Sequence, residues 1–285
     1  MDLVDPRAVA RFRRNRGALV GLAIVAVMIV LSAFAPLLAP HDPTAAFKSR
    51  TLTTQGVPIG PTREFPLGAD PVGRCELSRL LYGGRVSLAV AFAATAIVVV
   101  LGTTVGVLAG YFGGLTDTLL MRLVDAMMSF PFLLVVMALN RIIRRPGLWV
   151  VFVVLGALSW LSLSRQVRAR TLGLRDQEFV LAARALGASP LRVIARHILP
   201  NVSSLVVVIA STLVAEMIVA ESVLSYLGVG VVPPAASWGS MLQESESLTR
   251  AVPRLTAAPG LAILLTIVGF NLLGEGLRDA LDPKA

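Results

Sequence analysis

Residues suited to catalysis or to phosphate binding are scarce in this sequence of 285 residues. A phosphate-binding loop needs a lysine directly after a glycine-rich turn, and the only lysines are Lys48, which follows a phenylalanine, and Lys284, which is next to last. His41 and His197 are too far apart in the sequence to suggest a metal site, and the lone Cys75 excludes an intrachain disulfide. We therefore expect a non-catalytic chain that binds neither ATP, nor a metal, nor another cofactor.

Two glutamates inside a long apolar stretch are the best candidates for chemistry within a membrane. Glu216 and Glu221 are five residues apart, about 140° around a helix, so they do not share a face. A charge at the bilayer centre costs about 2.5–3.5 kcal/mol on insertion scales, so both should face the bundle interior, a water-filled cavity or the outer interface. Lining a pathway and structural hydrogen bonding both stay open for these two residues. Asn140 is a further candidate for a pathway.

The composition places these residues in a polytopic membrane protein. Hydrophobic residues make up 55% of the chain and charged residues 15%, whereas a soluble domain carries about 25% charged residues. The net charge of +9 comes almost entirely from arginines. Because they flank apolar stretches instead of lining an aromatic-bearing face, we exclude nucleic acid as a partner and expect contact with anionic lipid head groups.

Six apolar stretches are candidates to cross the roughly 30 Å hydrocarbon core. They cover residues 17–38, 86–112, 126–140, 147–164, 198–227 and 255–274. The third is the shortest and needs an interfacial turn before it. We therefore predict an all-α fold of six transmembrane helices with both ends inside. Arg141, Arg144 and Arg145 then fall outside, against the positive-inside rule, but the loop at 165–200 is richer in arginine and falls inside.

The chain divides into two parts on this pattern. Residues 1–85 form a cytoplasmic tail, an anchor helix and an external loop, because the first apolar stretch exceeds the roughly 7–15 residues of a signal peptide. Residues 86–285 form the transmembrane core, with a cytoplasmic loop at 165–200. The end of the external loop, residues 74–81, has the spacing of a short amphipathic helix on the outer membrane surface, although a packed loop helix is an equal alternative.

Two smaller patterns predict helix contacts in the core. Gly102, Gly106 and Gly110 are four residues apart, so they share one face and allow another helix to approach closely. Asp117 follows a Gly-Gly pair and is a candidate cap for the next helix.

The polar block at residues 176–201 has the pattern of two short helices joined by a Gly-Ala-Ser-Pro turn. Asp176 is the candidate N-cap of the first helix, Gly187 ends it, and Ser189 caps the second. The expected apolar stripes are Phe179, Ala182, Ala183 and Leu186, then Leu191, Ile194, Ala195 and Ile198. Helices this short are unstable alone in water, so the membrane domain or a partner must hold them.

Four stretches resemble the permeases of ATP-binding-cassette importers. Ala182-Ala183, Gly187 and Leu199-Pro200 are spaced as in that family's cytoplasmic loop motif. Three others are similar to the peptide and nickel branch, and they read GRCELSRLLYGGRVSL at 73–88, GGLTDTLLMRLVDAMMSFPF at 113–132 and SYLGVGVVPPAASWGSML at 225–242. The anchor helix with its external loop resembles the second permease of the dipeptide and oligopeptide pair.

The resemblance implies a type I importer permease fold in the bacterial cytoplasmic membrane, carrying di- or oligopeptides. It implies a sister permease, ATPase subunits that hold ATP and magnesium, an external solute-binding protein, and loop helices that dock on the ATPase. The implied ATPase-coupling residues are Glu178, Phe179, Ala182, Ala183, Leu186, Gly187, Ala188, Ser189, Pro190, Arg192, Leu199 and Pro200. Whether the ATPases are two chains or one fused chain stays open.

Three departures from the family's pattern and three alternatives remain. Leu181 stands in place of the motif's glutamate, Cys75 in place of an external aspartate, and His197 in place of an isoleucine. Nickel or another small solute is an alternative substrate. A secondary transporter would need more ion-binding groups within the membrane and usually an internal repeat, neither of which is evident. A purely structural subunit would tolerate loss of the loop's apolar face.

Overall fold

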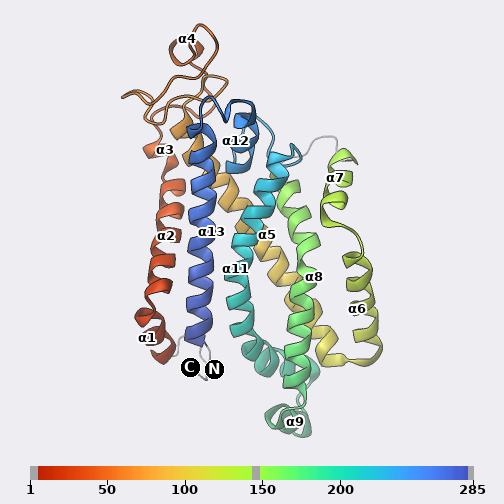
Figure 1. The fold of residues 1–285 in the computed structure, drawn as a ribbon. Coiled ribbons are helices and arrows are strands. Elements are labelled where there is room, and N and C mark those ends of the chain that lie inside the picture. The colour runs from red at the N-terminus through yellow and green to blue at the C-terminus, as the bar shows by residue number, and fades with distance from the viewer. Residues whose placement is uncertain (1–5, 143–147, 282–285) are drawn as a thin grey trace.

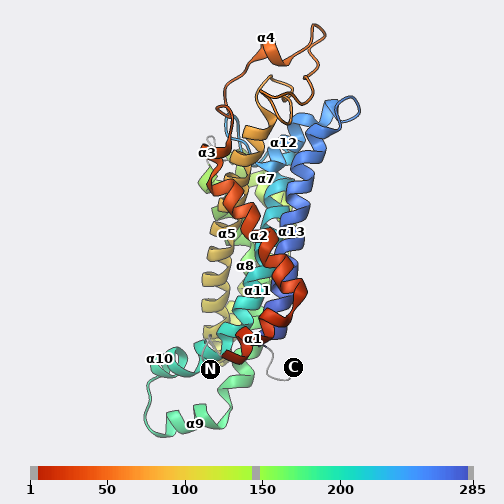
Figure 2. The same ribbon diagram turned by 90° about the vertical axis from the view of Figure 1, so that its left-hand side faces the viewer.

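The computed structural model describes residues 6–142 and 148–281, and those residues form helices with no β-strand. Long helices stand side by side and run between two opposite ends of the molecule (Figure 1). The segment at residues 40–75, with the short helix α4 (Lys48–Thr51), covers one end, and α9 (Glu178–Ala185) projects from the other (Figure 2). We call these the outer and the inner end.

Four helical runs are long and apolar enough to cross a membrane. They are α2 (Arg16–Ala33), α5 (Glu76–Phe112), the run Pro190–Tyr226 and α13 (Arg254–Leu281). A fifth candidate is a broken span, in which α6 (Gly114–Met128) and α7 (Phe132–Ile142) are bent by 79° at residues 129–131. Pro131 lies in that break. Proline has no backbone N–H, and at this position no helical hydrogen bond requires one.

The first and last helices meet at the inner end. Asn15 separates α1 (Pro6–Arg14) from α2, and its Oδ1 accepts a hydrogen bond from the Ala18 N–H at 3.1 Å. Its Nδ2 donates to Asp279 near the end of α13 at 3.0 Å. At the outer end the helix breaks at Phe34 before α3 (Ala35–Leu38), so the predicted first span is helical in two pieces.

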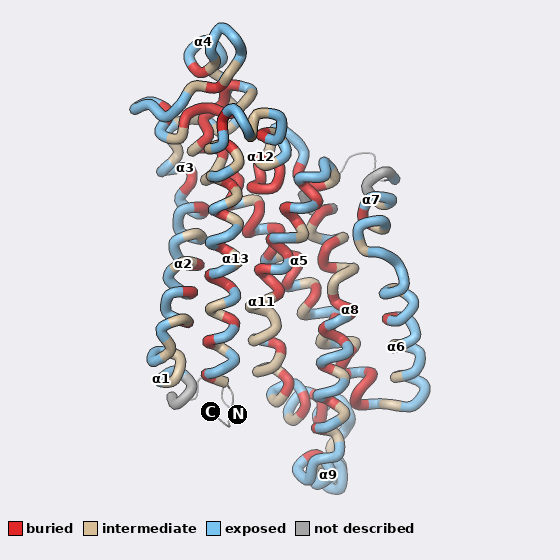
Figure 3. The backbone as a smooth tube through the Cα atoms, in the orientation of Figure 1, coloured by how far each residue is buried: buried red, intermediate tan, exposed pale blue. Residues whose placement is uncertain are grey.

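The three predicted glycines on α5 do face another helix, which is α8 (Leu148–Arg175). A Cβ added at Gly106 would lie 2.6 Å from the Ser164 carbonyl oxygen, and one at Gly110 would lie 2.8 Å from the Arg168 carbonyl oxygen. Gly156 on α8 faces α5 in the same way. Figure 3 shows the buried backbone where α5, α8 and α11 (Leu199–Tyr226) meet. The close contact confirms the glycine prediction and fixes α8 against α5.

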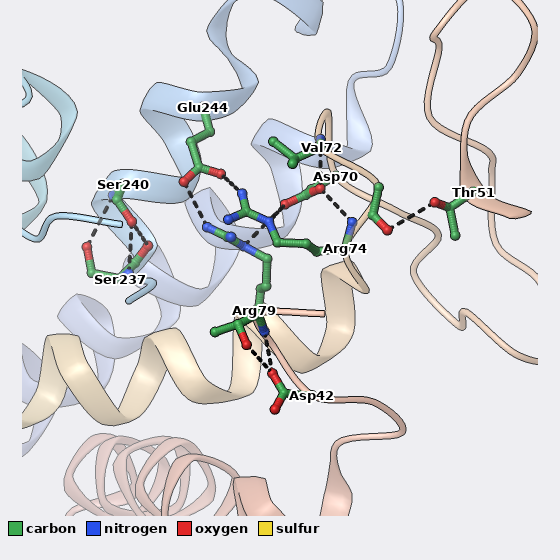
Figure 4. A network of polar contacts seen from close by, with 11 residues as sticks. Asp42, Thr51, Asp70, Val72, Arg74, Arg79, Ser237, Ser240 and Glu244 are labelled. Atoms are coloured by element: carbon green, nitrogen blue, oxygen red, sulfur yellow. Dashed lines mark hydrogen bonds and ion pairs between the residues drawn. The ribbon is translucent and has the colours of Figure 1, made fainter. Parts of the chain in front are cut away.

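A cluster of four charged side chains holds the outer segment on the helices (Figure 4). Arg74 pairs with Asp70 and with Glu244 of α12 (Trp238–Ser245), each at 2.5 Å. Arg79 pairs with the same two carboxylates, at 3.4 Å and 2.9 Å. Asp70, Arg74 and Arg79 are buried. Glu244 connects them to α12, which is followed by the short 3₁₀ turn Glu246–Leu248 and then by α13.

This cluster corrects the prediction for residues 74–81. They form no separate helix on the membrane surface, because α5 is continuous from Glu76 and both Glu76 and Arg79 are buried. Arg74 and Arg79 both pair with Glu244, which lies 165 residues after Arg79. Because this partner is so distant in the sequence, the local pattern resembled the polar face of a surface helix. The predicted span at 86–112 is the inner three-quarters of the same helix.

Substituting Gly106 by alanine should destabilise the helix pair by about 1–3 kcal/mol, because the new methyl group meets backbone that cannot rotate away. Gly173→Ala is the matched control, since Gly173 lies on α8 and an added Cβ there would have nothing within 4 Å. Thermal unfolding in detergent should show a lower midpoint for Gly106→Ala only. Equal midpoints for the two variants would contradict the close contact.

Glu244→Ala should leave two buried guanidinium groups with Asp70 as their one remaining partner in the cluster, at a cost of about 3 kcal/mol. The exposed Glu246 provides the control, and Glu246→Ala should have little effect. Limited proteolysis of the outer segment should be faster in the first variant and unchanged in the second. Unchanged cleavage in both would show that the cluster does not hold the segment.

Candidate functional site

The segment between α8 and α11, residues 176–198, projects from the inner end, and we call it the projecting segment. Its helix α9 starts one residue later than predicted. Gln177 has the extended backbone of an N-cap, whereas Asp176 pairs with Arg175 at 3.3 Å. Glu178 lies in the first turn, where its charge suits the positive end of the helix dipole.

Gly187 ends α9 as the sequence predicted. Its φ of +81° lies in the left-handed region, which costs a glycine little. The Gly187 N–H donates to the Arg184 carbonyl at 2.9 Å, and the Ala188 N–H donates to the Ala183 carbonyl at 3.0 Å. These two bonds form a Schellman motif, which satisfies carbonyls that the helix end would leave free.

The second predicted helix is not separate. Ser189 is the N-cap of α10 (Pro190–Val193), although its side chain makes no capping bond, and α10 runs into a π-helical turn (Ile194–Ile198) and then α11. Pro200 lacks an N–H and crowds the carbonyl four residues earlier. The π turn just before Pro200 is wider than an α-helical turn and leaves room for the proline ring, so the helix does not break there. One helical run therefore extends from Pro190 to Tyr226.

Val180 and Val193 attach the projecting segment to the helices above it. Both are fully buried, and they belong to one apolar cluster with Ile194, Ile198 and residues of α5 and α8. Ala183 packs against the same cluster. The buried face of α9 is therefore Val180 and Ala183, of which only Ala183 belongs to the predicted stripe.

The other residues of the first predicted stripe face outward, as does Leu191 of the second, whereas Ile194 and Ile198 of the second are buried as predicted. Leu186 is 88% exposed and Leu191 is 76% exposed, on either side of the Gly187 turn. Phe179 and Leu181 are 42% and 49% exposed. Water disfavours four exposed apolar side chains on one small projection, and such patches mark contact sites. We call these four residues the apolar tip.

Ion pairs between α6 and α8 support the base of the projecting segment. Asp117 accepts two hydrogen bonds from the Arg168 guanidinium, so it does not cap its own helix as predicted. Asp125 pairs with Arg165 at 2.5 Å. These ion pairs hold α6 against α8. The chain then continues from α8 into α9, which carries two of the four residues of the apolar tip.

The two glutamates of α11 have different surroundings. Glu221 is fully buried and accepts hydrogen bonds from Ser225 at 2.6 Å and from Ser87 of α5 at 3.0 Å. The Ser87 hydroxyl in turn accepts from the Trp238 N–H at the start of α12 at 3.2 Å. Glu221 therefore joins three helices and lines no open surface of this chain. Glu216 is exposed.

Some predicted residues lie outside the described part of the structure. The side chains of Asn140 and Arg141 are not described, and neither are Arg144 and Arg145. Within the described residues, no group of three or more His, Cys, Asp or Glu side chains is placed to hold a metal ion.

Two family descriptions match this chain. Residues 102–285 match the inner membrane components of binding-protein-dependent transport systems, and residues 7–55 match the N-terminal transmembrane domain of oligopeptide transport permease C. The chain belongs to this family of permeases. It is thus a multi-pass protein of the inner membrane and a transport component.

Relatives of known name cover nearly the whole permease. The oligopeptide transport system permease protein of Haemophilus influenzae is 39% identical over 96% of this chain and 86% of its own length. The dipeptide transport system permease protein of Alkalihalophilus pseudofirmus is 36% identical over 97% of this chain and 89% of its own. The glutathione transport system permease protein of Escherichia coli is 38% identical, over 96% and 88%.

Substitutions at Gly187 should act through the backbone alone, because nothing lies within 4 Å of an added Cβ. A residue with a side chain costs about 1–2 kcal/mol in the left-handed region, and asparagine is tolerated better than alanine or valine. Hydrogen exchange at the amides of α9 should therefore speed up in the order Gly187→Asn, Gly187→Ala, Gly187→Val. Equal exchange in all three would exclude the Schellman turn.

Proposed function

We propose that this permease forms half of the pathway of an ATP-driven importer of di- or oligopeptides and couples that pathway to ATPase subunits. The apolar tip carries this proposal. It is a projection attached by Val180 and Val193, and its outward apolar side chains are 42–88% exposed. A groove on a second protein supplies apolar surroundings, and an amphipathic helix in an apolar groove is a common mode of recognition.

The described contacts support coupling by the apolar tip. Arg168 and Arg165 join α8 to α6, and the last part of the projecting segment, from Pro190, continues without a break into α11. A force on the tip therefore acts on two spans at once. The remaining residues of the expected coupling set, Glu178, Ala182, Ala188, Ser189, Pro190, Arg192, Leu199 and Pro200, lie on the same projection or directly after it.

We further propose that α8 is the sixth span and that both ends of the chain lie inside. The 28 residues of α8 are about 42 Å long, and its first half is apolar. Arginines crowd its inner end and the projecting segment, as the positive-inside rule requires of a cytoplasmic loop.

The proposal also includes the partners of such a permease. ATP and magnesium belong to the ATPase subunits, an external binding protein delivers the peptide to the outer end, and a sister permease supplies the other half of the pathway. The names of the relatives, which are oligopeptide, dipeptide and glutathione permeases, favour a peptide over nickel as the substrate.

Leu186→Arg should abolish coupling without disturbing the fold, because the side chain is 88% exposed. Truncating or charging a residue central to a contact typically costs 2 kcal/mol or more, so peptide uptake and binding-protein-stimulated ATPase activity should fall by about tenfold or more. Both are measured on the complete transporter in proteoliposomes.

Leu115→Arg provides the matched control, since Leu115 is 81% exposed near the same end but lies on α6. This control should keep both activities, and both variants should reach the membrane in normal amounts. Full activity of the Leu186→Arg transporter would refute coupling through the apolar tip.

A further inference from the structure

Glu216 is an exposed carboxylate deep in a membrane span. Its neighbours along the helix, Ala215, Met217 and Ile218, are all buried at 4% exposure or less. Within the described part of the chain, no cationic nitrogen lies within 4 Å of its carboxylate and no hydrogen bond is made to it. The residue therefore projects alone from the helix surface.

The hydrogen bond between Glu221 and Ser87 shows how deep Glu216 lies. This bond places the fifth residue after Glu216 level with Ser87 of α5. Because α11 runs from the inner to the outer end (Figure 1), Glu216 is about 7.5 Å further from the outer end, and about 15 Å below Tyr226. At that level α5 has entered its stretch without charges, residues 86–112.

A carboxylate at this depth does not face lipid, because acidic side chains in spans point to a bundle interior or to a water-filled cavity. The interior of this chain is excluded, since Glu216 is exposed whereas Glu221 occupies the interior position. The remaining choices are water and a neighbouring chain.

We propose that Glu216 faces the aqueous translocation pathway and attracts the terminal ammonium group of the transported peptide. This inference rests on the proposed function. Every peptide with a free N-terminus carries that cation, whatever its side chains. The chain has a net charge of +9, which repels cations, so one acid in the pathway supplies a local attraction that the rest of the chain does not.

Val219 lies one turn from Glu216 on the same exposed face and is 43% exposed, so a cysteine there reports the local field. The native Cys75 is fully buried and gives a low background. The probes are a cationic and an anionic methanethiosulfonate of similar size, applied to Val219→Cys in the complete transporter. The cationic reagent should react about tenfold faster relative to the anionic one than it does with the Val219→Cys/Glu216→Gln double variant.

Transport provides the second measurement. Glu216→Gln should reduce the uptake of a free tripeptide by about tenfold while binding-protein-stimulated ATPase activity and the amount of assembled complex stay unchanged. A purely structural role would lower the amount of complex as well. Glu275→Gln, which removes another exposed acid near the end of α13, is the control and should change neither the reagent preference nor uptake.

Three results overturn the inference. If the wild-type complex imports peptide but the reagent preference is the same with and without Glu216, the carboxylate does not act on the pathway. If Val219→Cys is unreactive in every state and Glu216→Gln loses the sister permease, the residue lies in a contact between chains. If the wild-type complex imports no peptide at all, the proposed function fails, and the assignment of a peptide ammonium fails with it.

Discussion

The close contact between α5 and α8 is the constraint on which the inner half of the structure depends. Lipid tails are as apolar as the side chains they surround, so helices in a bilayer associate through close packing and polar contacts more than through the hydrophobic effect. Gly102, Gly106 and Gly110 allow that packing by removing the side chains between the two backbones. The position of α8 then determines where α6 and the projecting segment lie, since both are attached to it.

The charged residues of the chain follow a second constraint. At the outer end, Asp70, Arg74, Arg79 and Glu244 neutralise one another, and at the inner end Arg168 and Arg165 neutralise the two aspartates of α6. Glu221 is buried with hydroxyl donors around it. Against this pattern, an acid with no partner on the exposed face of a span stands out as a residue that serves something outside the chain.

Local sequence patterns predicted the features that depend on neighbours within a few residues. These are four of the six apolar spans with a broken fifth, the shared face of the α5 glycines and the left-handed turn at Gly187. The sequence could not assign partners that come from distant elements. Asp117 has the position of a helix cap, yet its partner Arg168 lies 51 residues away, and the charges of Arg74 and Arg79 are matched by Asp70 and Glu244.

The face of α9 was missed for a related reason. Its apolar residues allow two faces that share Ala183, one through Phe179 and Leu186 and one through Val180. Spacing alone does not tell which of the two packs inward, because the answer depends on where α5 and α8 place their own apolar side chains. The structure selects Val180 and Ala183, and so leaves the larger side chains free.

The unbroken helical run from Pro190 to Tyr226 has a mechanical consequence. It behaves as a lever whose short arm is α10 and whose long arm is α11, which reaches about 26 Å from Leu199 to Glu216. A tilt of α11 by about 10° about the π turn displaces Glu216 sideways by about 4.5 Å. Amplification of this kind requires no relay of intermediate contacts, and the π turn before Pro200 is the place where the lever has the least stiffness.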